Sequence, residues 1–145
     1  MSRDIAAERA AVLAEARRWI GTPYHNHARR LGAGVDCVQL LIAVYHAVGL
    51  IPAVETANYP VDWHLHRDEE RYLDGIEQYG RPVDVAEPGD VTVFRFGRCY
   101  SHGAILDRDG AYIHAYLGRG VISTLGSHPP LAGRPVRHFT LWGAA

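Results

Sequence analysis

Hydrophobic positions in the first half of the chain repeat with the spacing of α-helices. Apolar residues recur three or four positions apart from Arg3 to Trp19, which predicts an amphipathic first helix. The segment from Cys37 to Val48 is apolar on nearly every side and stops before Gly49, so we expect a buried central helix there. A third, weaker helix is predicted from Asp68 to Tyr79, with Gly75 interrupting it.

The pattern then changes to short runs that are typical of β-strands. Turn residues separate these runs, and the Asp109-Gly110 pair is typical of a β-hairpin. The predicted strands are Val91–Phe96, Gly103–Leu106, Ala111–Ala115, Gly120–Ser123 and Val136–Trp142. Helices followed by strands predict an α+β fold with an antiparallel sheet. A length of 145 residues fits a single domain that spans residues 1–145.

Composition and charge exclude several classes of function. The net charge is -1 and the chain has no basic run, so we expect no nucleic-acid partner. No segment is apolar for long enough to insert into a membrane, and the charged amino terminus does not read as a signal peptide. We therefore expect a protein made in the cytoplasm without an export signal. Its two cysteines are far fewer than a disulfide-dense secreted scaffold contains.

One cysteine stands where a helix start favours a nucleophile. Cys37 follows Asp36, the predicted N-cap, and lies in the first turn of the second helix. Exposed N–H groups and the helix dipole stabilise a thiolate at such a position. A thiol nucleophile also needs a base and a group that orients the base. His102 and His114 are the candidates for these two roles, since they flank the Asp109-Gly110 turn on neighbouring predicted strands.

Short motifs follow one another along the chain in a characteristic order. They are Gly21-Thr22-Pro23-Tyr24, Asp36-Cys37, Pro88-Gly89-Asp90-Val91, Ser101-His102-Gly103 and Ile113-His114-Ala115. With these motifs the sequence resembles the NlpC/P60 family of papain-like cysteine peptidases. The resemblance implies a papain-like fold, with N-terminal helices packed on an antiparallel β-sheet. It also implies catalysis by Cys37, His102 and His114, without a metal or another cofactor.

The same resemblance implies a substrate and a setting. The expected substrate is a peptidoglycan stem peptide, cut between γ-D-glutamate and the diamino acid. Tyr24 is expected to help bind the oxyanion, while Asp36 and Ser101 are expected to contact the substrate. More narrowly, the chain resembles the short NlpC/P60 peptidases of phage tails and gene transfer agents. This implies tail-tip or baseplate proteins as partners, and action in the periplasm or cell wall of a recipient cell.

The sequence leaves alternatives open. An N-acetylmuramoyl-L-alanine amidase uses the same Cys–His apparatus, and a structural tail-tip module would keep the fold with little activity. Cys37 and Cys99 would form a disulfide if their Cα atoms lay within about 7 Å. Together with His102 and His114 they carry zinc-binding atoms, but their spacing matches no zinc finger, so no metal site is predicted. Val38-Gln39 replaces the usual Ser-Gly of the family, which puts the preferred peptide in doubt.

Overall fold

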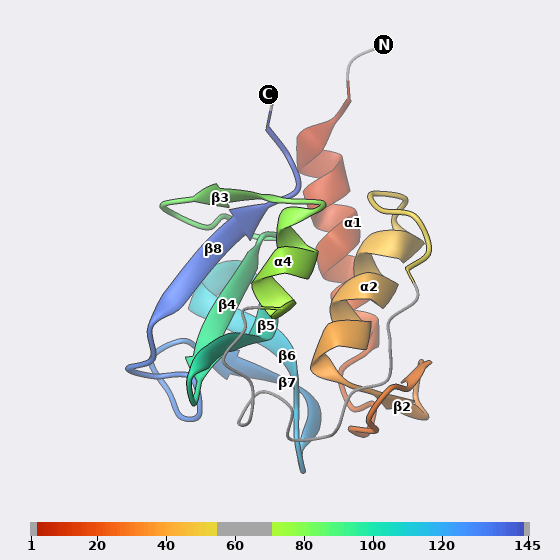
Figure 1. Ribbon diagram of the computed structural model, residues 1–145. Helices are drawn as coiled ribbons and strands as arrows, with labels where there is room; N and C mark the ends of the chain where they lie inside the picture. The colour runs from red at the N-terminus through yellow and green to blue at the C-terminus, as the bar shows by residue number, and fades with distance from the viewer. Residues whose placement is uncertain (1–2, 55–70, 144–145) are drawn as a thin grey trace.

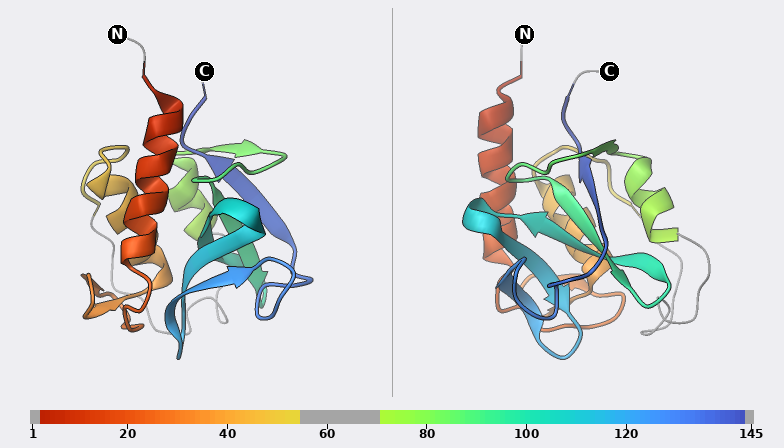
Figure 2. Two further views of the ribbon diagram at one scale, coloured as in Figure 1. Left: turned by 180° about the vertical axis from the view of Figure 1, so that it is seen from behind. Right: turned by 90° about the vertical axis from the view of Figure 1, so that its left-hand side faces the viewer.

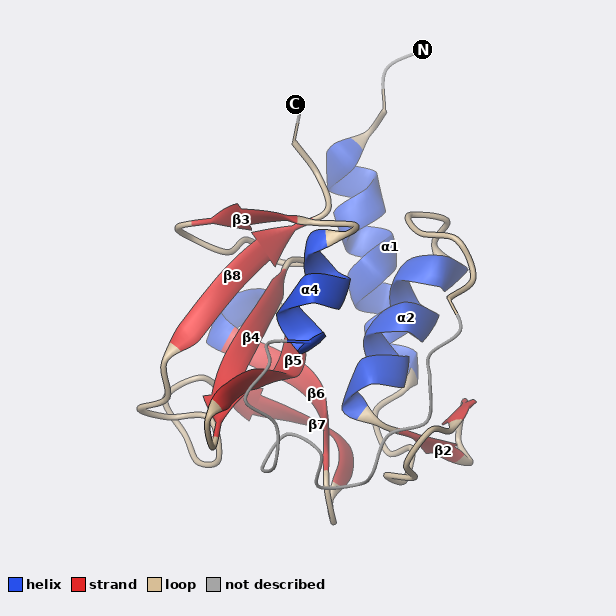
Figure 3. Cartoon of the chain, viewed as in Figure 1, coloured by secondary structure: helices blue, strands red, loops and turns tan. Residues whose placement is uncertain are grey.

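The helices lie together on one side of a β-sheet. The computed structural model describes residues 3–54 and 71–143. Figure 3 shows the helices in blue beside the sheet in red. The first helix, α1 (Ile5–Arg18), is shorter at both ends than predicted. Asp4 has extended backbone and caps its start by accepting a hydrogen bond from the N–H of Ala7, and Trp19 is its C-cap.

The second and third helices are close to their predicted places. Helix α2 (Cys37–Ala47) matches its prediction within one residue, and Gly49 follows it with a φ of 81°. Helix α4 (Arg71–Glu77) runs straight through Gly75, so the predicted interruption is wrong. A glycine weakens a helix by about 1 kcal/mol relative to alanine but does not break it. The predicted start of this helix, residues 68–70, lies outside the described residues.

The main sheet has six strands, and every neighbouring pair is antiparallel. Its spatial order is β3-β8-β4-β5-β6-β7 (Figure 1). The strands are β3 (Arg81–Val83), β4 (Val91–Phe96), β5 (Cys99–Leu106), β6 (Ala111–Tyr116), β7 (Gly120–Leu125) and β8 (Val136–Thr140). The predicted α+β class and antiparallel sheet are therefore confirmed. Strand β3 was not predicted, because its pairing with β8 joins segments far apart in the chain.

Strand β5 pairs unequally with its two neighbours. It pairs with β4 from Ile105 to Cys99, with a shift in register between Phe94 and Arg95, so it begins four residues earlier than predicted. Its pairing with β6 is restricted to Ile105–Ile113 and Leu106–Tyr112, beside the tight turn η1 (Arg108–Gly110). Beyond Ile105 the two strands separate. This separation is the feature of the fold that makes room for the histidine side chains described below.

The core lies between α2 and the sheet. Leu40 and Val44 of α2 are fully buried with Ile105 and Ile113 of the paired strands. Helix α1 packs on α2, and its start lies near the end of β8, at one end of the molecule (Figure 2). No helix within residues 3–54 or 71–143 is long and apolar enough to cross a membrane.

Candidate active site

The start of α2 is held by the buried carboxylate of Asp36. Its Oδ1 accepts hydrogen bonds from the N–H groups of Val38 (3.0 Å) and Gln39 (2.9 Å). Its Oδ2 accepts one from the N–H of His27 at 2.8 Å. The predicted N-cap role of Asp36 is thereby confirmed. Because Asp36 joins the preceding loop to the helix, it fixes the direction in which Cys37, the first helical residue, presents its thiol.

Tyr24 lies beside Cys37 because its segment is paired with the strand that leads into the helix. A small hairpin of β1 (Arg29–Arg30) and β2 (Gly34–Val35) precedes α2, and Tyr24 forms a parallel bridge with Val35. The Tyr24 hydroxyl hydrogen-bonds with the thiol and with the backbone N–H of Cys37. Burial, with the nearby Cys37 and Asp36, raises the pKa of Tyr24, so its hydroxyl stays protonated and can donate.

The Cys37 thiol is neutral in the resting site. Burial, followed by the charge of Asp36, raises its pKa to about 12. The N–H groups of Cys37 and Val38 and the Tyr24 hydroxyl act in the opposite direction, since they stabilise the thiolate. The predicted stabilisation of the thiolate by the helix start is therefore present, but burial outweighs it. A proton acceptor must take the thiol proton before the sulfur can act as a nucleophile.

His102 and His114 meet where β5 and β6 separate. Nε2 of His102 lies 2.7 Å from Nδ1 of His114, and the two rings are nearly perpendicular, at 87°. Both are buried, with exposed fractions of 7% and 0%. Nε2 of His114 lies 2.9 Å from Oγ1 of Thr124 on β7. The prediction that neighbouring strands bring the two histidines together is confirmed.

The surroundings of the two histidines are mostly aromatic. The rings of Phe96 and Tyr116 lie 4.8 and 5.9 Å from that of His102, measured between ring centroids. Burial lowers the pKa of His114 to about 4. At neutral pH His114 is thus an uncharged hydrogen-bond partner of His102.

The thiol lies against the strand that carries His102. The Cys37 sulfur is 3.8 Å from the carbonyl oxygen of Ser101, the residue directly before His102. The Ser101 hydroxyl is buried and has no hydrogen-bond partner within the described residues. The residues that the sequence predicted for this site, Cys37, His102, His114, Tyr24, Asp36 and Ser101, therefore all lie at or next to one place, between the start of α2 and strands β5 and β6.

Tyr72 of α4 joins the two halves of the site, and the sequence analysis missed it. Its hydroxyl donates to the carbonyl oxygen of Cys37 and accepts from the N–H of Gly103, each at 3.1 Å. A Cβ at position 103 would collide with this hydroxyl and lie 2.7 Å from Cδ1 of Leu41. The glycine after His102 was therefore a signal of close approach at this point. No local signal identified either Tyr72 or Thr124.

The two cysteines are both free thiols, so the disulfide alternative is not supported. Within the described residues, no three His, Cys, Asp or Glu side chains are placed to hold a metal ion.

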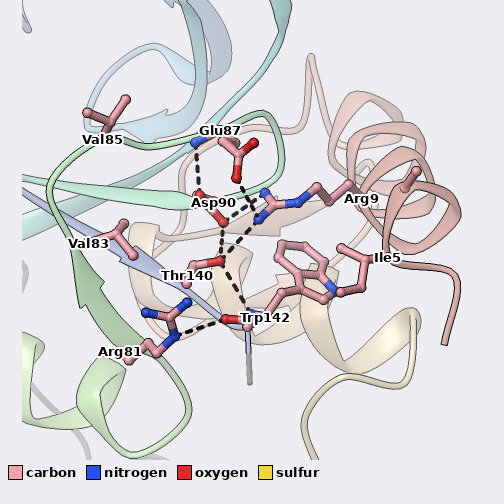
Figure 4. A pocket seen from close by; sticks show the side chains of 11 residues that line it. Ile5, Arg9, Arg81, Val83, Val85, Glu87, Asp90, Thr140 and Trp142 are labelled. Atoms are coloured by element: carbon pink, nitrogen blue, oxygen red, sulfur yellow. Dashed lines mark hydrogen bonds and ion pairs between the residues drawn. The ribbon is translucent and has the colours of Figure 1, made fainter. Parts of the chain in front are cut away.

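A pocket of about 410 Å³ lies away from Cys37, at the end of the molecule where α1 begins (Figure 4). Arg9 of α1 crosses it and donates to Oδ1 of Asp90 (2.9 Å) and to the carbonyl oxygen of Pro88 (3.0 Å). Thr140 of β8 also donates to Asp90, at 2.5 Å. These contacts tie α1 to the sheet. They give the Pro88-Gly89-Asp90 motif a structural role, distinct from the chemistry at Cys37.

Comparisons with known proteins identify the fold of this chain. The sequence matches no known family model and no curated protein. Solved structures do match, among them the NlpC/p60 domain of the peptidoglycan hydrolase SagA, with a TM-score of 0.61 and 24% identity. That match covers 89% of this chain and 96% of the SagA domain. The chain has the NlpC/P60 fold.

Two mycobacterial neighbours differ in what they do. The peptidoglycan hydrolase RipB from Mycobacterium tuberculosis matches with a TM-score of 0.63 and 17% identity, over 99% of this chain and 70% of RipB. RipD from the same organism is described as a non-catalytic NlpC/p60 domain protein adapted to peptidoglycan binding. It matches with a TM-score of 0.60 and 14% identity, over 93% of this chain and 98% of RipD. The NlpC/P60 fold thus occurs in both hydrolases and binding proteins.

Proposed function

We propose that this protein is a cysteine peptidase that hydrolyses peptidoglycan stem peptides, with its 145 residues forming one NlpC/P60-type domain. The observation that carries the proposal is the 2.7 Å hydrogen bond between His102 and His114, next to a helix that begins at Cys37. A thiol, a base and a group that orients the base are the components that covalent peptide cleavage requires. The neighbours that are peptidoglycan hydrolases support the choice of substrate.

In the proposed reaction, His102 acts first as base and then as acid. Its Nε2 is engaged by His114, so Nδ1 is the nitrogen that accepts the thiol proton. The Cys37 sulfur attacks the scissile carbonyl, the carbonyl C=O electrons move onto oxygen, and the C–N bond then breaks. The imidazolium of His102 protonates the leaving amine. Water, activated by the same histidine, hydrolyses the thioester and restores the thiol.

The raised pKa of Cys37 determines when in the reaction the thiol loses its proton. A thiol with a pKa near 12 stays protonated at rest, so deprotonation accompanies attack on a bound substrate. Negative charge that then develops on the substrate oxygen needs hydrogen-bond donors. The backbone N–H of Cys37 and the hydroxyl of Tyr24 are the proposed oxyanion donors, since both already hydrogen-bond at the sulfur.

The finer assignments follow the family resemblance of the sequence. The proposed bond joins γ-D-glutamate to the diamino acid, and the proposed setting is the tail tip of a phage-like particle that opens the wall locally. Ser101 is a candidate substrate contact, because its buried hydroxyl has no hydrogen-bond partner within the described residues. Asp36 is the candidate for a free amine of the stem peptide, alongside its capping role.

A second candidate function is peptidoglycan binding without cleavage. It is favoured by the burial and high pKa of Cys37, which are also properties of an unreactive thiol. The non-catalytic description of RipD, which shares the fold, is consistent with it. An amidase that cuts the bond between glycan and stem peptide is the alternative within the enzymes.

The test compares the wild-type protein with Cys37→Ala and Cys99→Ala on purified peptidoglycan, with fragments identified by mass spectrometry. Cys99→Ala is the matched control, since Cys99 is the other buried free thiol. We expect the wild type and Cys99→Ala to release peptides that contain the diamino acid, and Cys37→Ala to release none. Release of whole stem peptides would indicate the amidase. Retention on peptidoglycan without any release would replace the peptidase with the binding function.

A further inference from the structure

The histidine pair continues to a third group on β7. Oγ1 of Thr124 lies 2.9 Å from Nε2 of His114, and Nδ1 of His114 lies 2.7 Å from Nε2 of His102. Thr124 reaches His114 diagonally across the strand pair, because Thr124 is in register with Tyr112 and His114 with Ile122. We call this chain of His102, His114 and Thr124 the relay.

The relay has two possible arrangements of its protons. His114 is fully buried and burial lowers its pKa to about 4, so it carries one ring proton at neutral pH. A neutral imidazole donates from one nitrogen and accepts at the other. In the first arrangement His114 donates to Thr124 and accepts from Nε2 of His102. In the second, Thr124 donates to His114, His114 donates to His102, and the proton of His102 sits on Nδ1.

These arrangements differ in whether His102 can act as a base. In the first, Nε2 of His102 carries the proton and Nδ1 has the lone pair that accepts the proton of Cys37. In the second, Nδ1 already carries a proton and cannot accept another. Once His102 is an imidazolium, both its nitrogens donate, so His114 must accept at Nδ1 and donate from Nε2. The charged state therefore requires Thr124 to be the acceptor.

We infer that Thr124 is a positioning residue of the proposed peptidase, whose hydroxyl oxygen accepts a hydrogen bond from His114 and thereby sets the tautomers of both histidines. The inference rests on the proposed function, since it concerns the same reaction. A threonine on a strand is well suited to this task, because its β-branched side chain holds the hydroxyl in few rotamers. Thr124 is half-buried, so its own proton can point to solvent while a lone pair faces His114.

The first test is the position of the proton on His114 in the wild-type protein. NMR of protein labelled with heavy nitrogen in its histidine rings distinguishes a protonated from an unprotonated ring nitrogen. We expect the proton of His114 on Nε2 and an unprotonated Nδ1. A proton on Nδ1 of His114 would overturn the inference. This measurement needs no substrate, so it can be read whether or not the protein cleaves peptidoglycan.

The second test removes the acceptor without changing the shape of the side chain. Thr124→Val deletes the hydroxyl, Thr124→Ser restores it, and Ser123→Ala removes an exposed hydroxyl from the opposite face of the same strand. A hydrogen bond that supports a charged group corresponds to about a 10- to 100-fold change in rate. We expect Thr124→Val to lower kcat/KM by that factor, Thr124→Ser to recover most of it, and Ser123→Ala to match the wild type.

The pH profile separates this role from a merely structural one. Without Thr124 the imidazolium of His102 is less stable, so the pKa of this base falls and the acid limb of kcat/KM should move to lower pH in Thr124→Val. The other titratable groups around the relay are Tyr116 on β6 and, at the start of α2, Cys37 with Asp36 and Tyr24. These stay unchanged in the variant. An unshifted profile, or a serine variant as slow as the valine one, would refute the role of Thr124.

Alkylation of Cys37 by iodoacetamide gives the same profile without peptidoglycan. It is measured in the Cys99→Ala background, so that one thiol reacts. If the wild type cut no peptidoglycan, the proposed function would fail, while alkylation and the histidine tautomer would still decide whether Thr124 controls the base.

Discussion

Replacing Tyr72 with phenylalanine tests how the nucleophile and the base are held at a fixed separation. The Tyr72 hydroxyl bridges the carbonyl oxygen of Cys37 and the N–H of Gly103, so it links the start of α2 to the residue after His102. Phenylalanine keeps the ring in the core and removes both hydrogen bonds. The change therefore acts on the alignment of the two segments and removes none of the proposed catalytic groups.

The size of the effect follows from the burial of these groups. Tyr72 is 7% exposed. An N–H group left without a partner in the interior costs about 1–3 kcal/mol. For a domain of this size, 1 kcal/mol shifts Tm by about 3 °C, so we expect a decrease of about 3–9 °C. Misplacement of reacting groups by a fraction of an ångström to 1 Å lowers rates by up to about 100-fold, so kcat/KM should fall by about tenfold or more.

The assay compares Tyr72→Phe with Tyr45→Phe. Tyr45 is also a buried tyrosine, and its hydroxyl donates to the carbonyl oxygen of Gly89 at 2.6 Å, away from Cys37. We expect Tyr45→Phe to lose stability with kcat/KM unchanged, and Tyr72→Phe to lose both. Thermal denaturation and peptidoglycan hydrolysis are measured on the same preparations. Equal kcat/KM for the two variants would refute the claim that Tyr72 aligns the site.

Two further predictions concern stability. The pKa of His114 is lowered from 6.5 to about 4 in the folded protein, so the unfolded chain binds its proton first as the pH falls. This difference in pKa contributes about 3 kcal/mol to the free energy of unfolding above pH 6.5, and the contribution is lost as the pH falls towards 4. Urea denaturation across this pH range should show the loss, and His114→Gln should make the free energy of unfolding less dependent on pH. Asp36→Ala should cost about 2 kcal/mol or more, because three N–H groups lose their acceptor, whereas Asp36→Asn keeps one acceptor oxygen and should cost less. If Asp36→Ala unfolded at the same urea concentration as the wild type, the capping argument would be contradicted.

Local sequence determined the elements and the identity of the chemical groups. Asp36 and Gly49 mark the two ends of the second helix, and both act through residues close in the chain, so the limits of this helix could be predicted from the sequence. The Asp109-Gly110 pair likewise predicted two adjacent strands, because Asp and Gly tolerate the positive φ that a tight turn requires. Asp109 has a φ of 64°. Both features made Cys37, His102 and His114 recognisable as candidate catalytic groups from local sequence alone.

The order of the strands in the sheet and their lengths could not be predicted from local sequence. Strand β8 lies between β3 and β4, and β5 extends back to Cys99 through its pairing with Phe96. Such pairings depend on the contacts of distant segments, which local propensity does not encode. The same limit hid Tyr72, whose partners in the site lie more than 30 residues away in the chain.

The sequence by itself therefore determined which groups are present: a thiol at a capped helix start and two histidines on neighbouring strands. Only the tertiary structure decided their state. Burial makes the Cys37 thiol neutral and keeps His114 uncharged, and the separation of β5 from β6 lets His102 and His114 bond. The physical reason is that hydrogen bonds and capping act between near neighbours, whereas desolvation depends on everything packed around a group.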